Sequence, residues 1–141
     1  MAGRYVYGKR HRYPHMIEEE KYVWERFMDM YPSKFETVDY DFRVGKGVVI
    51  DSESGSQWPR MAKMLSQKRI DVVGWVGDSP TIVEVKKRVG LSALGQVLGY
   101  RILFMKDLKH FPEPELLVIC ETISEDDNLV LEGNRIPVEV V

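Results

Sequence analysis

Asp71, Glu84 and Lys86 are of residue types that together can hydrolyse a phosphodiester bond. Such hydrolysis requires neutralisation of the phosphate charge and a nucleophilic water, and a divalent cation supplies both. Magnesium prefers one or two carboxylates and keeps several waters, so Asp71 and Glu84 are suitable ligands, with the carbonyl of Val85 as a third. The Lys86 ammonium could orient or help deprotonate the attacking water. An acid-x-Lys triplet alone is usually a surface charge pair. Whether this one belongs to an active site therefore depends on the helices and strands around it.

The hairpin predicted over residues 69–87 would bring these three residues together. Gly77-Asp78-Ser79-Pro80 separates two stretches rich in β-branched residues, which is typical of a turn between strands. If Val76 pairs with Thr81, Asp71 lies opposite Lys86, and opposed residues share a face. The two-residue period of a strand adds Glu84 to that face, and a two-residue slip still leaves all three together. The opposite face would then hold Val72, Val76, Val83 and Val85.

Residues 16–31 have the apolar periodicity of an amphipathic helix that stops before Pro32. Glu20 falls at the centre of the apolar face, and an inward carboxylate is costly unless it is paired or binds a metal. Glu20 therefore completes the acidic cluster if this helix packs over the hairpin. The alternative is that Glu20, in the first turn, lies near solvent and interacts favourably with the helix dipole.

Residues 91–108 predict a mostly buried helix with Ser92 as its N-cap. Gln96 and Tyr100 are four residues apart and share a face of this helix. Gly95 and Gly99 each cost about 1 kcal/mol of helix stability relative to Ala. We expect the backbone there to approach the sheet or a ligand closely.

Two stretches before the hairpin have mixed patterns. Residues 37–50 alternate and predict a strand, or a hairpin that turns at residues 45–47. Residues 51–68 begin with a polar, turn-rich run and predict a short helix from Trp58 onward.

The remainder of the chain predicts one strand, one helix and one further strand. Residues 114–122 are a nearly continuous apolar run, which is typical of a central strand covered on both faces. Residues 124–134 predict a helix capped by Ser124, and residues 135–141 predict an edge strand. A strand–helix–strand crossover implies a parallel pair within a mixed sheet. The expected architecture is a three-layer α/β sandwich.

Composition indicates one globular domain. The chain has 141 residues, and no apolar run approaches the roughly 20 residues that span a bilayer. The N-terminus lacks the apolar core of a secretory signal, so we expect a cytoplasmic protein. The single cysteine, Cys120, excludes an internal disulfide, and its apolar surroundings predict a buried structural thiol.

Residues 1–15 are expected to form a basic arm ahead of a single domain at 16–141. Tyrosines alternate there with basic residues, which can neutralise phosphates while aromatic rings stack on bases. A solvated terminus is compatible with the same pattern. The candidate nucleic-acid contacts are Arg4, Lys9, Arg10, Arg12, Lys63 and Lys68.

Through Asp71 and the Glu84-x-Lys86 triplet, the chain resembles the PD-(D/E)xK nuclease superfamily, whose motif is an acid followed by (Asp/Glu)-x-Lys. Ile70 stands where that motif often has Pro. The resemblance implies a restriction-endonuclease-like αβββαβ core over about residues 17–122, a Mg²⁺ or Mn²⁺ cofactor, and DNA as substrate.

Gln96 and Tyr100 match the Gln-x-x-x-Tyr pattern of the RecB-type branch, which is similar to Holliday-junction resolvases. In that branch the pair helps to shape the site and contacts DNA. The first helix of the family often contributes a Glu, for which Glu20 is the candidate.

Three functions follow from these residues. The first is a metal-dependent nuclease that cuts DNA and could belong to a phage or other mobile element. A homodimer would suit the cutting of both strands, because a twofold axis relates two sites. The second is a catalytically inactive nuclease-fold subunit that binds DNA or supports assembly. The third is a protein-interaction domain in which Glu84 and Lys86 form a salt-bridged strand face.

Overall fold

Six strands form one mixed sheet in the order β1-β2-β3-β4-β5-β6 in the computed structural model, which describes residues 2–47, 60–61 and 66–141. The strands are β1 (Tyr5–Val6), β2 (Thr37–Val44), β3 (Lys68–Val76), β4 (Ser79–Val89), β5 (Glu115–Ile123) and β6 (Val138–Val140). Pairing is antiparallel from β1 to β4 and parallel from β4 to β6. The predicted mixed sheet, with its parallel pair and C-terminal edge strand, is confirmed.

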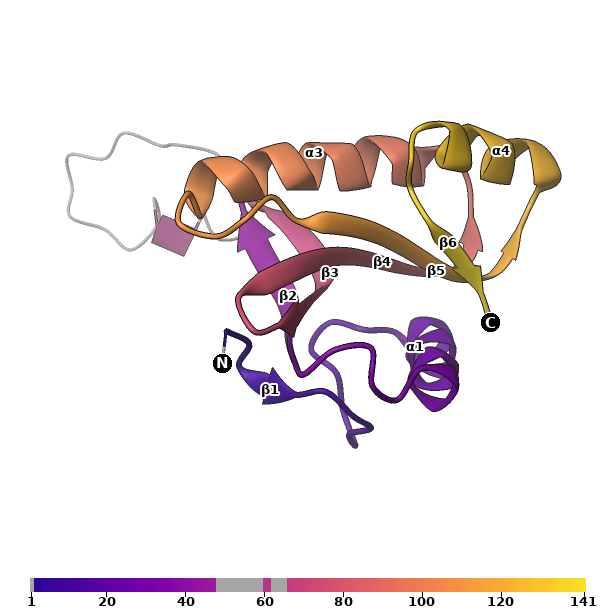
Figure 1. The fold of residues 1–141 in the computed structure, drawn as a ribbon, viewed down its shortest axis with the longest axis horizontal. Helices are drawn as coiled ribbons and strands as arrows, with labels where there is room; N and C mark the ends of the chain where they lie inside the picture. The colour runs from indigo at the N-terminus through magenta and orange to yellow at the C-terminus, as the bar shows by residue number, and fades with distance from the viewer. Residues whose placement is uncertain (1, 48–59, 62–65) are drawn as a thin grey trace.

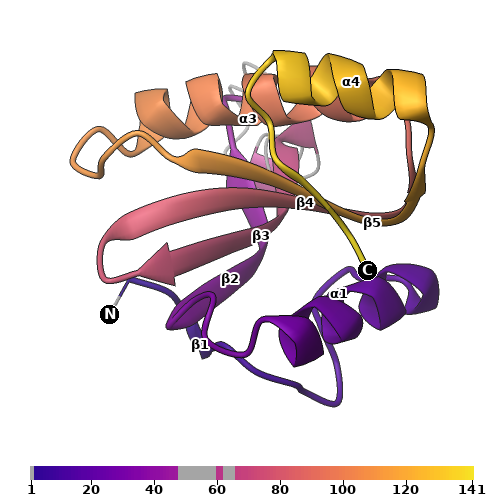
Figure 2. The same cartoon turned by 45° about the vertical axis from the view of Figure 1, so that its right-hand side comes forward.

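Helices cover both faces of the sheet. Helix α1 (Glu18–Met30) lies on one face, and α3 (Ser92–Asp107) and α4 (Glu125–Gly133) lie on the other (Figures 1 and 2). The described elements therefore form an α/β fold with the layering of a three-layer sandwich.

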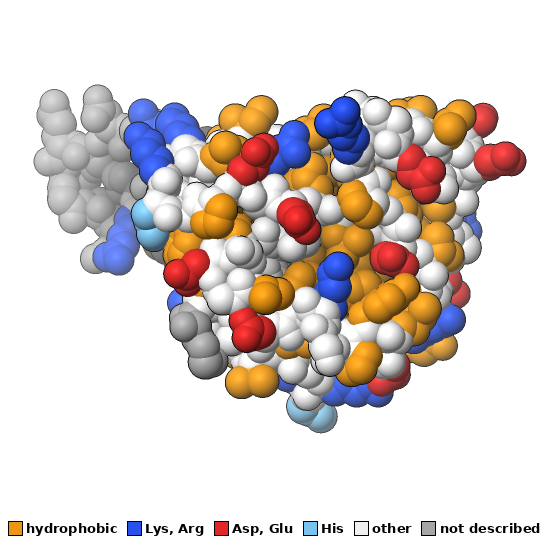
Figure 3. All heavy atoms as spheres, viewed as in Figure 1, with side chains coloured by type: hydrophobic (Ala, Val, Ile, Leu, Met, Phe, Trp, Pro, Cys, Tyr) orange, Lys and Arg blue, Asp and Glu red, His pale blue; other side chains and the backbone are white. Residues whose placement is uncertain are grey.

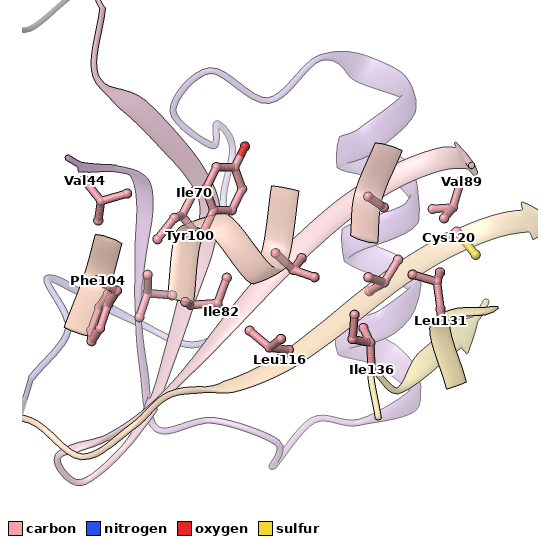
Figure 4. Close-up of a cluster of buried hydrophobic side chains, with 14 of the residues drawn as sticks. Val44, Ile70, Ile82, Val89, Tyr100, Phe104, Leu116, Cys120, Leu131 and Ile136 are labelled. Atoms are coloured by element: carbon pink, nitrogen blue, oxygen red, sulfur yellow. The ribbon is translucent and has the colours of Figure 1, made fainter. Parts of the chain in front are cut away.

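Each interface between helix and sheet has its own apolar core. On the α1 side, Val23, Trp24 and Phe27 pack on the sheet, as the apolar periodicity of this helix predicts. On the α3 and α4 side, Ile82, Phe104 and Ile136 belong to a second cluster, which is drawn in Figure 4. Strand β5 lies between the two layers and is buried continuously from Leu116 to Cys120.

Local signals place the C-terminal elements correctly. The Ser124 hydroxyl accepts a hydrogen bond from the Asp127 amide at 3.1 Å, so Ser124 is the N-cap of α4 as predicted.

Cys120 is buried, and burial raises the pKa of its thiol to about 11.

Helix α3 differs from the prediction in two respects. It buries only one face, through Ala93, Val97, Tyr100 and Phe104, whereas Ile102 on the other side is 67% exposed. Its N-cap is Leu91, without a side-chain cap, because the helix already includes Ser92. A Cβ added at Gly95 or Gly99 would meet nothing within 4 Å, so these glycines do not mark a close approach to the sheet.

The β3–β4 hairpin has a different register from the predicted one. Val76 pairs with Ser79 rather than Thr81, and Gly74 pairs with Thr81. Only Gly77 and Asp78 lie between the strands, and Gly77 has a φ of 57°, which a tight hairpin turn requires. The register is displaced by two residues, which preserves the alternation of side chains between faces.

Residues 2–15, expected as an arm, pack on the sheet over part of their length. Tyr5 and Val6 pair with Val38 and Thr37 as β1, and Tyr13 is buried in the α1-side cluster. The charged side chains of this segment therefore lie between two points of attachment to the rest of the protein.

Some expectations fall outside the described residues. The predicted polar run at 51–57 and the residue Lys63 lie there, whereas residues 60, 61 and 66 are helical, within the stretch predicted as a short helix. Among the described residues, no helix has the length and apolar composition to cross a membrane.

Candidate active site

The candidate site lies where β3 and β4 separate. The β3–β4 pairing runs from Val76–Ser79 to Val72–Val83 and stops before Asp71. There the Asp71 carboxylate accepts a hydrogen bond from the Val85 amide at 3.0 Å. We call the region around Asp71 and Glu84 the strand fork. A side chain takes the place of the backbone acceptor at this point, so Asp71 is held beside the Glu84–Lys86 segment.

The orientation of side chains reverses at the fork. Ile70 belongs to the cluster under α3, but Val72, two residues later, belongs to the cluster under α1. On the neighbouring strand, Tyr40 and Phe42 differ in the same way. Between them lies Asp41, whose φ of 51° is left-handed and rare for a residue other than glycine. Irregular backbone of this kind redirects side chains, so the fork can gather groups from both layers.

Glu84 is the most deeply buried charged group of the site, with a side chain that is 2% exposed. Burial, together with the nearby carboxyl of Asp71, raises the pKa of Glu84 to about 8. Among the described residues, the Glu84 Oε2 atom is buried and has no hydrogen-bond partner. A hydrogen bond between the Glu84 and Asp71 carboxyls also raises the pKa of Glu84, because the proton lies on Glu84. Once Glu84 loses that proton, its buried oxygen is unfavourable unless another group binds it.

Lys86 and Glu20 lie at the edge of the acidic pair. The Lys86 Nζ atom is 3.6 Å from Glu84 Oε1, and its side chain is 39% exposed. Glu20 is partly buried in the first turn of α1 and lines a small cavity that also includes Asp71. Burial and the charge of Asp71 raise the pKa of Glu20, which shows that the two carboxyl groups are close enough to interact. The expectation that Glu20 faces the hairpin acids is met.

Tyr100 approaches the same acids from α3, and Gln96 forms a hydrogen bond with Tyr100. Burial and then the charges of Glu84 and Asp71 raise the pKa of the Tyr100 phenol to about 12, and a hydrogen bond with Gln96 opposes this rise. Figure 4 shows the Tyr100 hydroxyl pointing away from the apolar cluster that holds its ring. Tyr100 and Gln96 also line a cavity of about 380 Å³ with Lys68, a predicted nucleic-acid contact.

Four further polar residues lie beside the fork, and sequence reasoning gave none of them a role in the site. Asp41 Oδ2 is 3.2 Å from His15 Nε2 and 3.7 Å from Arg43, and its other oxygen is 3.8 Å from Arg69. His15 and Asp41 line the small cavity with Glu20 and Asp71. No spacing in the sequence indicates this grouping, since it depends on left-handed backbone at both His15 (φ 56°) and Asp41.

The basic candidates of the N-terminal segment separate into two groups. The exposed Lys9 ammonium lies 2.7 Å from the Asp29 carboxylate, which offsets part of its charge. Arg10 and Arg12 line a cavity with His15, whereas Arg4 lines a neighbouring cavity with Asp41 and other residues of β2. These arginines are therefore better placed than Lys9 to meet a ligand at the fork.

The donor set suits a hard cation in part. Two carboxylates with one unpartnered buried oxygen match the few protein ligands that Mg²⁺ takes. Within the described ranges, however, no three His, Cys, Asp or Glu side chains are grouped as a preformed metal site. A cation here would bind through Asp71 and Glu84 and keep other positions for water or substrate.

No family model, curated protein or solved structure matches this chain. Conclusions about its activity therefore depend on the geometry of the fork.

Proposed function

We propose that this chain is a metal-dependent nuclease that hydrolyses phosphodiester bonds in DNA. The observation that carries the proposal is the buried Glu84 carboxyl, with one unpartnered oxygen, between Asp71 and the partly exposed Lys86. A structural ion pair would not need a second carboxyl that opposes the ionisation of the first. Buried groups with perturbed pKa values and specific charged neighbours are common at catalytic sites.

Asp71 and Glu84 would hold Mg²⁺ or Mn²⁺, with the backbone carbonyl of Val85 and the side chain of Glu20 as further candidate ligands. When bound, the cation supplies neutralisation of the phosphate charge and a water with a lowered pKa. The mutual repulsion of the carboxyls favours such a ligand, because a cation relieves the cost of ionising both.

The other residues of the fork would act on the substrate. The Lys86 ammonium, partly exposed beside Glu84, can orient the attacking water and stabilise negative charge on the phosphate. The Tyr100 hydroxyl, which stays protonated at neutral pH, can donate a hydrogen bond to a phosphate oxygen. Gln96 orients that hydroxyl through their shared hydrogen bond.

The order of elements supports a restriction-endonuclease-like core within the α/β fold. Helix α1, strands β2, β3 and β4, helix α3 and strand β5 follow one another as αβββαβ. We propose this core, with the acids at the fork of its central strands, as the framework of the nuclease.

A cleavage assay tests the proposal. Supercoiled, linear, single-stranded and branched DNA would be incubated with the protein in Mg²⁺, Mn²⁺ or EDTA, beside the variants Asp71→Asn, Lys86→Ala and Lys87→Ala. We expect metal-dependent cleavage that falls roughly 100-fold or more in the first two variants. Lys87→Ala is the matched control, because Lys87 is the next residue but is exposed and lies 3.9 Å from Glu19.

Two outcomes would contradict a nuclease site at the fork. Metal-independent binding without cleavage of any substrate would favour a catalytically inactive nuclease-fold subunit. Cleavage that persists in Asp71→Asn and Lys86→Ala at the wild-type rate would place the activity outside the fork, or in a contaminant.

A further inference from the structure

A basic groove lies beside the fork, on the part of the molecule formed by the N-terminal segment. It has a volume of about 490 Å³ and is lined by residues 10–16 together with Tyr5, Glu18 and Lys21. We call it the N-terminal groove. Three of its lining residues, Arg10, Arg12 and Lys21, are cationic, and Glu18 is the only acid among them. Figure 3 shows Lys, Arg and His side chains along the lower edge, where this segment lies in Figure 1.

The arginines of the groove are available to an anion. Within the described part of the chain, neither Arg10 nor Arg12 forms an ion pair, whereas the adjacent Lys9 is bound to Asp29 at 2.7 Å. The acids Asp39 and Asp41 of the neighbouring cavity are already engaged with other groups of the protein. A polyanion in the groove would therefore meet a net positive charge.

Contacts within the protein position both the backbone and the side chain of Arg10. Its guanidinium lies over the ring of Tyr5, 4.3 Å from the ring centre, and Tyr5 is held by pairing in β1. The Arg10 amide donates to the Tyr13 hydroxyl at 2.9 Å, and that hydroxyl donates to Glu25 of α1 at 2.8 Å. A side chain held in this way loses little entropy when it binds a ligand.

The groove adjoins the candidate active site. Pro14, His15 and Met16 line both the N-terminal groove and the small cavity that includes Glu20 and Asp71. A strand with its scissile phosphate at the fork would pass along these residues into the groove.

We propose that the N-terminal groove binds the sugar-phosphate backbone of a single DNA strand next to the scissile bond, with Arg10 and Arg12 as phosphate contacts. The inference rests on the proposed nuclease function, because the fork sets where the strand must lie. It assigns binding to Arg10 and Arg12 and excludes Lys9, although all three lie within four residues of one another.

The salt dependence of binding tests this assignment. The affinity of a labelled single-stranded oligonucleotide would be measured by fluorescence anisotropy in EDTA over a series of salt concentrations. Each phosphate contact adds about 0.7 to the slope of log affinity against log salt for single strands. We expect the slope to fall by about 1.4 in the double variant Arg10→Ala/Arg12→Ala and to stay unchanged in Lys9→Ala. An unchanged slope in the double variant, or an equal fall in Lys9→Ala, would overturn the assignment.

Conservative variants keep the test decisive if the double variant unfolds. Arg10→Gln and Arg12→Gln should each lower the slope by about 0.7, and Arg10→Lys should restore it. A thermal melt of each variant establishes that it is folded. If Arg10→Lys binds no better than Arg10→Gln, the role of Arg10 is structural and the proposal fails.

The two proposals can fail separately. Cleavage that depends on Asp71 and Lys86, with a salt slope of binding that does not depend on Arg10 and Arg12, would refute only the proposal for the groove. If the salt slope depends on both arginines but the protein cuts no substrate, DNA binding in the groove is supported and the proposed nuclease activity is refuted.

Discussion

Replacing Glu84 by Gln is expected to abolish cleavage and, at neutral pH, to stabilise the fold. The side chain of Glu84 is 2% exposed, and burial with the nearby Asp71 carboxyl raises its pKa to about 8. Glutamine has nearly the same shape but carries no charge. The substitution therefore removes a candidate ligand and, with it, the cost of burying an ionisable group.

The magnitude and sign follow from proton linkage. The pKa of an ordinary Glu is 4.5, so between that pH and about 8 the folded protein keeps a proton on Glu84 that the unfolded chain has lost. Stability therefore falls as the pH rises through this range. At pH 7 the difference covers about 2.5 pH units at roughly 1.4 kcal/mol each, or on the order of 3 kcal/mol. Glu84→Gln should be more stable than wild type by about this amount at pH 7 and no more stable at pH 4.

Urea unfolding at pH 4, 7 and 9, followed by circular dichroism in EDTA, measures this difference. Glu115→Gln, the same chemical change at an exposed position, is the control and should alter stability by less than about 0.5 kcal/mol at each pH. A stability gain of equal size at pH 4 and pH 7 would show that Glu84 has an ordinary pKa. A loss of stability at pH 7 would show that its charge is favourably paired, which would refute the reasoning.

Three further changes have defined expectations. Gly99→Ala should raise the free energy of unfolding in urea by about 1 kcal/mol, because the added Cβ meets nothing within 4 Å and Ala favours a helix. Gly74→Ala should lower it by about 1–3 kcal/mol, because the Cβ would lie 2.5 Å from the ring of Phe35; an unchanged midpoint would show that the ring moves freely. Mg²⁺ at 100 times its Kd should stabilise the wild type by about 2.7 kcal/mol, which a rise in melting temperature would show. It should not raise the melting temperature of Asp71→Asn or Glu84→Gln. An equal rise in all three proteins would place the cation elsewhere.

Local patterns in the sequence were sufficient for most elements of the fold. The apolar periodicity of α1, the capping serine of α4 and the continuous apolar run of β5 each depend on neighbouring residues, so the sequence predicts them directly. Asp71, Glu84 and Lys86 could be grouped from the alternation of side chains between the two faces of a hairpin. A two-residue error in register does not change which face each side chain occupies.

The register itself could not be predicted, because Ser79 and Pro80 have the composition of a turn but belong to β4. Proline lacks the amide hydrogen of a strand ladder, which favours its assignment to the turn. The structure places Pro80 at the beginning of the strand, opposite Trp75, where the two-residue turn at Gly77 and Asp78 already closes the hairpin. Here the geometry of the turn overrides the composition of the sequence.

Glu20 lies close to Asp71 only because of the strand fork, since regular alternation of side chains along the strands would keep the two apart. Helix α1 packs on Val83 and Val85, so it covers the face opposite to the one on which alternation places Glu84. In a regular sheet, a side chain from α1 could not approach acids on the far face. The reversal of side-chain orientation at Asp41 and Asp71 removes this barrier, because it brings the Asp71 carboxyl within reach of both layers. The left-handed backbone at Asp41 therefore allows side chains of α1 and α3 to approach the same carboxyl, at a cost of about 1–3 kcal/mol.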